Sequence, residues 1–251
     1  MGGAIARCLR RAHPEASIFG IDPDKTKIHE LEHDGVLKSF PDTARFEHGV
    51  LLLSIKPQLL EVVAGQLKSR LGADVTVVSI LAGVPLGRLR AALGTDQVVR
   101  VMPNLASTVG AGATAIATDG HSEAALARAR AILVPTGEVV DVTESQLDAV
   151  TGLSGSGPAY VLKFLMALED GGVLAGLPRA VSHKLAMATV AGTVRLAQES
   201  HLEWDVLRGQ VTSPGGTTIH GLKALEDNGF AAAVMSAVVA ATERSRELGK
   251  S

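Results

Sequence analysis

The stretch Val50-Leu-Leu-Leu-Ser-Ile-Lys-Pro57 joins an unbroken apolar run to a polar turn. Such a run is typical of a strand that is buried on both faces of a parallel sheet. Ser54 and Lys56 then follow the carboxyl end of that strand, where such sheets bind ligands, and Pro57 suits the first turn of a helix. The stretch predicts an α/β fold with a crevice beside residues 54–57. Lys56 taken alone is equally consistent with an ordinary loop residue.

The same alternation of short β-branched runs and helical patterns continues through the first two-thirds of the chain. It is the sequence pattern of a parallel α/β sheet. Strands are predicted at residues 17–21, 50–55, 75–80, 98–101, 113–117 and 139–142. Helices are predicted between them at residues 3–11, 25–34, 58–71, 86–93 and 122–133.

Strand patterns end after about Val142, and apolar residues then recur at helical spacing. The last such stretch, residues 230–248, places Val234, Val238 and Ala241 on one face. The simplest division is an α/β domain over residues 1–146 followed by an all-helical domain over residues 147–251. The boundary is expected within residues 143–151.

The chain opens at Met1-Gly2-Gly3-Ala4-Ile5. Dinucleotide-binding Rossmann folds begin with a buried strand, then Gly-x-Gly-x-x-Gly, then a helix whose N-terminus faces the pyrophosphate. Gly2 and Gly3 match the end of that loop and are candidate cofactor-binding residues. The first strand is missing, which should leave two neighbouring strand edges unpaired. Either the true start lies upstream or the chain is a defective fragment, and the otherwise well-formed motifs of the chain favour an upstream start.

A second distinctive stretch is Val211-Thr-Ser-Pro-Gly-Gly-Thr-Thr-Ile219, between two apolar helical patterns. Its proline and glycines break the helix. Ser213, Thr217 and Thr218 then lie at the start of the next helix, where free amides and the helix dipole favour an anion. The stretch indicates a pocket for a small amino-acid-like ligand. A capped turn between two helices is the alternative interpretation.

Composition narrows the function classes. Hydrophobic residues make up 46% of the chain but aromatic residues only 3%, so the core must be built from alanine, valine and leucine. A formal net charge of -2, without a run of Lys or Arg, argues against a nucleic-acid partner. The histidines are scattered, which argues against a metal site. Cys8 is the single cysteine, and no apolar run suggests a membrane span, so a reducing cytoplasm is expected.

Five motifs occur together in one order, and this combination is more specific than any one of them. The two stretches quoted above are accompanied by Ser79-Ile-Leu-Ala-Gly83, Val99-Arg-Val-Met-Pro-Asn104 and Thr151-Gly-Leu-Ser-Gly-Ser-Gly-Pro-Ala-Tyr160. Over residues 1–248 the chain resembles the pyrroline-5-carboxylate reductase family. These NAD(P)H-dependent oxidoreductases catalyse the last step of proline biosynthesis, a branch of amino-acid biosynthesis.

The resemblance implies a set of cofactor-binding residues along the carboxyl ends of the strands. They are Ser54, Ile55, Lys56, Pro57, Ala82, Gly83 and Asn104. The family usually continues after the asparagine with a small residue and proline, whereas Leu105 and Ala106 stand here, so these two are not carried over.

Asp22 ends the predicted strand at residues 17–21, where an acid can accept hydrogen bonds from the ribose hydroxyls. Its carboxylate would also repel the additional phosphate of NADP. We therefore expect a preference for NADH. An ordinary turn aspartate is the alternative, and Lys25 or Lys27 could restore binding of NADPH.

The implied reaction is hydride transfer to the C=N bond of pyrroline-5-carboxylate. We expect Ser213, Gly215, Gly216 and Thr217 to bind the carboxylate of this substrate. Thr218, the candidate catalytic residue, is expected to hydrogen-bond the ring nitrogen. The Gly-x-Ser-x-Gly pattern within residues 152–156 resembles a hydrolase elbow. No strand-to-helix context or triad partners accompany it, so we reject that interpretation.

The small-residue helical half implies a homodimer or a larger homo-oligomer, as the family forms; a self-contained bundle is the alternative. Two other functions stay open. One is a different two-domain NAD(P) oxidoreductase, such as a prephenate or hydroxyacid dehydrogenase. The other is a non-catalytic helical dimer. The hydroxyl stretch argues against both, because neither requires it.

Overall fold

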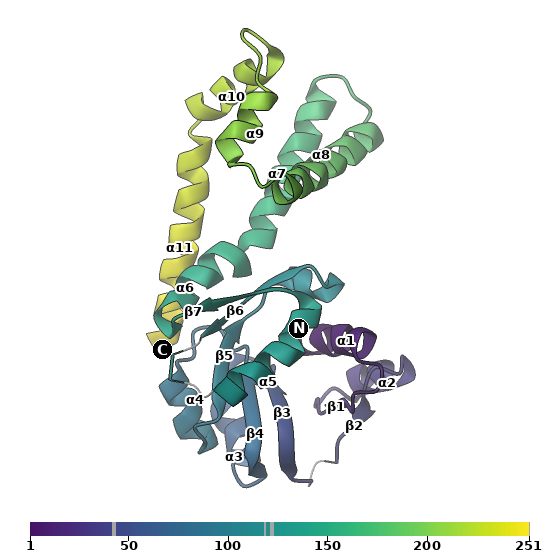
Figure 1. The fold of residues 1–251 in the computed structure, drawn as a ribbon, viewed down its shortest axis with the longest axis vertical. Coiled ribbons are helices and arrows are strands. Elements are labelled where there is room, and N and C mark those ends of the chain that lie inside the picture. Colours follow the sequence, from purple (N-terminus) through teal and green to yellow (C-terminus); the bar gives the residue numbers. More distant parts are fainter. Residues whose placement is uncertain (42–43, 118, 121–122, 251) are drawn as a thin grey trace. The chain divides into compact units, whose positions relative to one another are not determined.

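The computed structural model describes residues 1–41, 44–117, 119–120 and 123–250 (Figure 1). It contains two compact units, Met1–Ser156 with Val239–Ser251, and Gly157–Val238. The first is an α/β unit and the second is helical. The predicted domain ranges, 1–146 and 147–251, differ from these two units at residues 147–156 and 239–251. As a statement about separate domains, those ranges stay a prediction.

The strands of the first unit form two sheets. The smaller pairs β1 with β2 in parallel, and the larger has the order β3-β4-β5-β6-β7. All six predicted strands are present, with shifted ends. The short strand β2 is not among the strands that the sequence predicts. The bounds are β1 (Phe19–Gly20), β2 (Lys38–Ser39), β3 (Phe46–Leu53), β4 (Leu71–Ser79), β5 (Val98–Met102), β6 (Gly112–Ala117) and β7 (Gly137–Val142).

One strand pair corrects the expectation of a parallel sheet. β5 and β6 run antiparallel, with Val101 opposite Ile116, while the other pairs are parallel. A parallel neighbour needs a crossover of about a dozen residues or more, usually a helix. The link from β5 to β6 contains only the short 3₁₀ helix η2 (Leu105–Val109), so the chain returns in the opposite direction.

The predicted helices of this unit are also present. The helix predicted at residues 58–71 ends at Leu67 because β4 begins at Leu71, and the predicted helix start at Ser122 lies outside the described residues. The bounds are α1 (Gly2–Ala12), α2 (Lys25–His33), α3 (Leu60–Leu67), α4 (Leu86–Leu93), α5 (Glu123–Leu133) and α6 (Leu147–Val150). Shorter turns are η1 (Pro57–Leu59), η3 (Val134–Thr136), η4 (Glu144–Gln146) and η5 (Thr151–Gly155).

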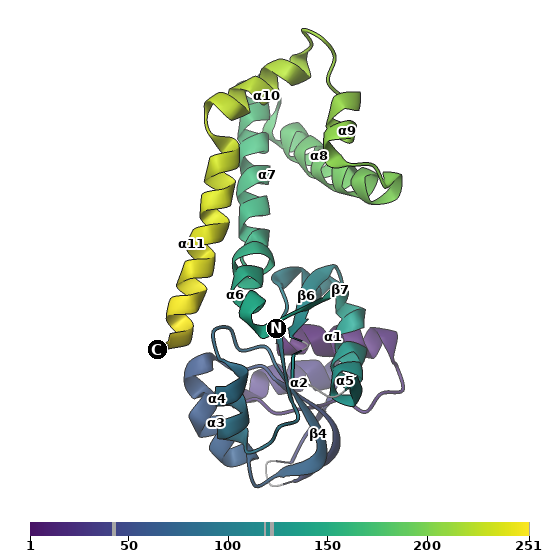
Figure 2. The ribbon, with the colours of Figure 1, turned by 60° about the vertical axis from the view of Figure 1, so that its left-hand side comes forward.

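The central strands of the large sheet are covered on both faces, as their apolar runs predict. Val75 and Val77 of β4 pack on one face with side chains of α3 and α4, whereas Val78 packs on the other face with α5. Figure 2 shows α3 and α4 on one side of the strands and α5 on the other. Successive strand residues point to opposite faces, so covering both faces requires an unbroken apolar run.

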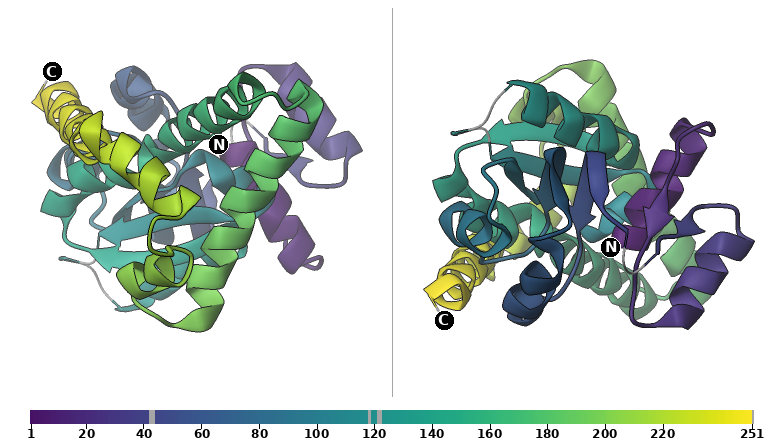
Figure 3. Two further views of the ribbon diagram at one scale, coloured as in Figure 1. Left: turned by 90° about the horizontal axis from the view of Figure 1, so that it is seen from above. Right: turned by 90° about the horizontal axis from the view of Figure 1, so that it is seen from below.

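The two sheets are not joined into one. Among the described residues, β1 pairs only with β2, and β3 pairs only with β4. The predicted unpaired edges are therefore present. Seen from below, the first helices, α1 and α2, lie beyond the β3 edge of the sheet (Figure 3).

The second unit consists of helices, as predicted for this part of the chain. They are α7 (Gly157–Leu174), α8 (Arg179–Ser200), α9 (Trp204–Gln210), α10 (Thr217–Asp227) and the start of α11 (Phe230–Lys250). α7 and α8 approach closely at Gly172, where a Cβ would collide with Ser182 Oγ. No single helix in the described part of the chain is long and apolar enough to cross a membrane. Within the same described residues, only the bent pair of α10 and α11 meets these criteria of length and composition.

Candidate active site

The start of α1 and the end of β3 meet in the first unit. The Gly2 amide donates a hydrogen bond of 3.0 Å to Ser54 Oγ, and a Cβ on Gly2 would stand 3.0 Å from Ser54 Cβ and Oγ. The structure thus brings together two predicted cofactor residues at a helix N-terminus, a setting that favours phosphate. A Cβ on Gly3 would contact the side chain of Leu31 in α2.

Residues 54–57 form the predicted turn after β3. Pro57 occupies the first turn of η1, as expected, and Lys56 is the exposed residue before it. The side chain of Ile55 packs against the core cluster shared by β4, α3 and α4, so it is turned away from solvent. Ser54 and Lys56 are therefore the side chains of this turn that a ligand can reach.

The other predicted cofactor residues follow the carboxyl ends of β4 and β5. Because β3, β4 and β5 are mutually parallel, Ser54, Ala82 and Asn104 lie along the same sheet edge. Asn104 Oδ1 accepts a 3.2 Å hydrogen bond from the Ala113 amide, which orients the side chain and leaves its NH₂ group as the donor toward a ligand.

Gly83 has a structural role of its own. Its φ of +74° is a conformation that favours glycine, and a Cβ there would stand 3.2 Å from the Gly249 amide nitrogen of α11. This packing against the C-terminal helix accounts for glycine at position 83 without a ligand. Its assignment to the cofactor stays a prediction.

The carboxylate of Asp22 follows β1, as predicted, and is part of a turn. Its Oδ1 accepts a 2.9 Å hydrogen bond from the Asp24 amide, while Asp24 caps α2 through the Thr26 amide. Lys27 Nζ lies 3.2 Å from Asp24 Oδ2. The hydrogen bond with Asp24 and the negative charge of Asp22 raise the pKa of Lys27. Lys27 is thus held by a carboxylate within its own turn.

The hydroxyl stretch of the second unit folds as a tight turn that leads into α10. The Gly216 amide donates to the Ser213 carbonyl at 3.1 Å, and Gly215 has a φ of +69°. Proline at the second position and glycine with positive φ at the third are the marks of a type II turn. A Cβ on Gly216 would collide with Ser213 Oγ, so the Ser213 hydroxyl lies against the start of the helix.

This geometry refines the predicted substrate residues. Gly216 caps α10, and its amide is already used within the turn. Thr217, Thr218 and Ile219 occupy the first turn of α10, where amides have no acceptor inside the helix. Thr217 is exposed and Thr218 half-buried. The donors available to an anion are therefore the amides of this first turn and the hydroxyls of Ser213, Thr217 and Thr218.

One residue near this turn was not expected from the sequence. His220, in the first turn of α10, places its ring Nδ1 2.9 Å from the Gly216 carbonyl oxygen. A single histidine carries no recognisable motif. The sequence feature that could have predicted this contact is the spacing of four residues between Gly216 and His220, because residues four apart lie on the same face of a helix.

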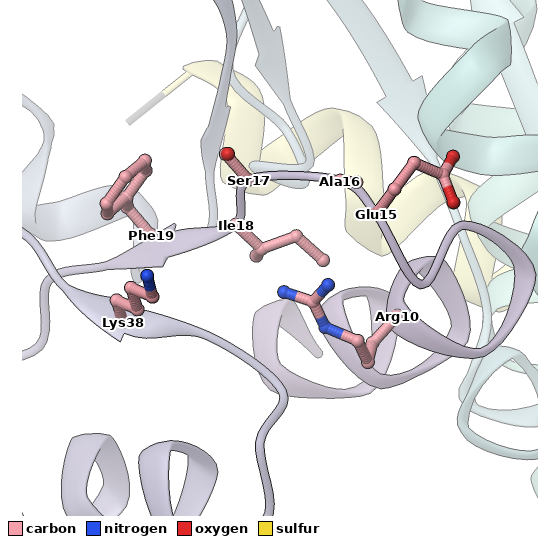
Figure 4. Close-up of a pocket in the computed structure, with 7 residues that line it drawn as sticks. All are labelled: Arg10, Glu15, Ala16, Ser17, Ile18, Phe19 and Lys38. Atoms are coloured by element: carbon pink, nitrogen blue, oxygen red, sulfur yellow. The ribbon is translucent and has the colours of Figure 1, made fainter.

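A surface pocket elsewhere in the first unit contains none of the predicted site residues. It is lined by residues 15–19 together with Arg10 of α1 and Lys38 of β2 (Figure 4). The Arg10 guanidinium already donates to the carbonyls of Val36 and Pro14. The described residues also contain no group of three or more His, Cys, Asp or Glu side chains that could hold a metal ion.

Comparison with known proteins identifies the family. The chain is 46% identical over 240 residues to a pyrroline-5-carboxylate reductase of Synechocystis, covering 94% of this chain and 89% of the relative. It is 43% identical over 258 residues to the pyrroline-5-carboxylate reductase of Arabidopsis thaliana, and the match covers 99% of this chain and 94% of that relative. The chain belongs to the pyrroline-5-carboxylate reductase family. Residues 144–248 also match the family model described as pyrroline-5-carboxylate reductase dimerisation.

Solved structures agree with this membership. Pyrroline carboxylate reductase of Plasmodium falciparum, solved with NADP bound, has a TM-score of 0.84 at 29% identity and covers 99% of this chain and 94% of its own. The Coxiella burnetii reductase has a TM-score of 0.87 at 29% identity, and the match covers 100% of this chain and 95% of that structure's chain. Prephenate dehydrogenase of Aquifex aeolicus shares the fold, with a TM-score of 0.54 at 18% identity, covering 91% of this chain and 93% of its own.

Proposed function

We infer that this protein reduces L-1-pyrroline-5-carboxylate to L-proline with a reduced nicotinamide dinucleotide. The identity of 46% across 94% of the chain carries this conclusion. The type II turn supports it from the residues themselves, because it gathers hydroxyls and helix amides at one place. Prephenate dehydrogenase, a representative of the alternative oxidoreductases, shares the fold at only 18% identity.

The residues of the first unit fit a dinucleotide. Gly2 leaves no room for a side chain beside Ser54, and polar groups follow three adjacent parallel strands. When bound, NAD(P)H supplies a hydride to the imine carbon of the substrate. The start of α1 would hold phosphate, Lys56 would add a positive charge, and Asn104 would orient the polar end of the cofactor or substrate through its NH₂ group.

The residues of the second unit fit the substrate. The carboxylate would accept hydrogen bonds from the Ser213 hydroxyl and from the Thr217 amide and hydroxyl, at the positive end of α10. Gly215 adopts the positive φ that the turn requires, and Gly216 has no side chain that would collide with the Ser213 hydroxyl. Thr218 would then hydrogen-bond the ring nitrogen and relay its proton. Orientation supplies much of the rate when the imine binds already protonated.

Turnover by the purified 251-residue chain tests the function directly. We expect NADH or NADPH oxidation to depend on added pyrroline-5-carboxylate and to yield proline, measured by absorbance loss and by amino-acid analysis. Oxidation without proline formation would point to another imine or carbonyl substrate. No substrate-dependent oxidation, in a chain that binds the cofactor by calorimetry, would contradict the assignment.

Cofactor preference is a finer proposal. Asp22 and Asp24 place two carboxylates after β1, and Lys27 is held by Asp24. This arrangement favours the free ribose hydroxyls of NADH over the added phosphate of NADPH. Repulsion between an exposed carboxylate and a phosphate a few ångströms away costs about 1 kcal/mol.

Replacing Asp22 with serine should therefore raise kcat/KM for NADPH relative to NADH by about five- to tenfold, because the repelling charge is lost. Steady-state kinetics with both cofactors measures the ratio. Asp96→Ser is the matched control, because it removes an exposed carboxylate before the amino end of β5. A wild-type preference for NADPH, or the same change in both variants, would argue against the proposal.

The helical unit supports association with a second copy. Among its described residues only Ser182 and Ala186 are buried, whereas Leu174 is 91% exposed and Trp204 81% exposed. So much exposed apolar surface marks an interface. Residues 144–248 match a dimerisation family model, which indicates a homo-oligomer of this chain.

Light scattering coupled to size exclusion should give at least twice the mass of one chain at micromolar concentration. A monomer under those conditions would favour a self-contained helical bundle. A cytoplasmic location, expected from the single cysteine, stays a prediction.

A further inference from the structure

His220 is held at the start of α10 by a contact that the reaction scheme above does not use. Its Nδ1 lies 2.9 Å from the Gly216 carbonyl oxygen, and Gly216 is the residue that caps the helix. A carbonyl oxygen can only accept, so Nδ1 must carry the proton and donate. This bond fixes one tautomer, in which the neutral ring has its acceptor nitrogen at Nε2.

The accepting carbonyl is the N-cap carbonyl of α10, which also accepts the first backbone bond of the helix. Gly215 and Gly216 are consecutive, and glycine is the residue with the greatest backbone freedom. Rotation of the peptide plane between Gly216 and Thr217 would move the Thr217 amide together with the Gly216 carbonyl. A side-chain donor on that carbonyl restrains both groups at once.

The Ser213 hydroxyl lies against Gly216. Ser213 Oγ occupies the space that a Gly216 side chain would need, and the Ser213 carbonyl accepts the Gly216 amide. The turn is fixed by the Ser213–Gly216 backbone bond, by the close approach of Ser213, by the first backbone bond of α10 on the Gly216 carbonyl, and by the ring of His220. The His220 ring adds a side-chain donor to the same carbonyl that the first helical amide already binds.

We propose that His220 is a positioning residue, which donates from Nδ1 to the Gly216 carbonyl and thereby aims the Thr217 amide and the Ser213 hydroxyl at the substrate carboxylate. The inference rests on the proposed function, since it assigns that carboxylate to this turn. It predicts an effect on substrate binding and not on the cofactor or the hydride step.

Replacing His220 with phenylalanine removes the donor and keeps a ring. We expect the KM for pyrroline-5-carboxylate to rise about five- to tenfold, the size expected for one hydrogen bond, with kcat and the KM for NADH close to wild type. His220→Asn places an NH₂ group near the position of Nδ1 and should restore a KM near wild type. Lys223→Ala is the control on the next turn of α10, where Lys223 pairs with Asp227.

Hydrogen exchange of residues 213–220, followed by mass spectrometry, provides a readout that does not depend on activity. Exchange should be faster in His220→Phe and near wild type in His220→Asn. An unchanged KM for pyrroline-5-carboxylate in His220→Phe, or an equal rise of this KM in His220→Phe and His220→Asn, would overturn the inference. The proposed function would stand in either case, provided that the wild-type chain turns over the substrate. Absence of wild-type turnover would instead overturn the function, and unchanged exchange in His220→Phe would overturn the positioning role by itself.

Discussion

Replacing Thr218 with alanine should lower kcat for pyrroline-5-carboxylate reduction by tenfold or more. Positioned proton-transfer groups contribute about 10²–10⁴-fold, and the loss is expected to be smaller than this range when the imine binds already protonated. Thr218 is the half-buried hydroxyl in the first turn of α10, whereas Thr217 beside it is exposed. The loss is expected in kcat, because a bond to the nitrogen matters most as that atom changes its charge.

Two matched variants separate this role from others. Thr218→Ser keeps the hydroxyl and should retain most of kcat. Thr217→Ala removes the neighbouring hydroxyl and should raise the KM for the substrate more than it lowers kcat. Steady-state kinetics with saturating NADH measures both constants. An unchanged kcat in Thr218→Ala would remove Thr218 from the mechanism.

Much of the fold was predictable because burial leaves a pattern in the sequence. The apolar runs of β3 and β4 predict strands covered on both faces, and α4 was predicted residue for residue, closed by Gly94 in the left-handed conformation. The antiparallel β5–β6 pair was not predicted, because strand direction depends on the length of the connection and not on the strands themselves.

The turn before α10 could also be predicted, because proline, glycine and hydroxyl residues restrict the backbone locally. The contacts of single groups could not. The bond from His220 to Gly216 is directed at a backbone carbonyl, which every residue has. The packing of Gly83 against Gly249 joins segments far apart in the sequence, and only the folded chain brings them together.

A partly buried ion pair between Arg100 and Glu144 carries the largest expected effect on stability. Arg100 of β5 is 8% exposed, and its Nη1 lies 3.1 Å from Glu144 Oε1. The same oxygen accepts the Leu86 amide at the start of α4, at 2.5 Å. The Glu144 amide in turn donates to Asp119 Oδ1 at 2.7 Å. One carboxylate therefore ties β5, α4 and η4 together in the first unit.

Replacing Arg100 with methionine should lower the free energy of unfolding by about 3 kcal/mol, because it leaves Glu144 charged and partly buried without its cation. Chemical denaturation followed by circular dichroism measures the change. The exposed pair between Arg128 and Asp74 is the matched control, and Arg128→Met should cost about 1 kcal/mol or less.

Adding Glu144→Gln to Arg100→Met distinguishes an uncompensated charge from lost packing. Glutamine keeps an oxygen for the Leu86 amide but carries no charge, so the double variant should recover part of the stability lost in Arg100→Met. No recovery would assign the loss to the packing of the arginine stem. If Arg100→Met costs no more stability than Arg128→Met, the Arg100–Glu144 pair contributes no more than an exposed pair, which would contradict the prediction.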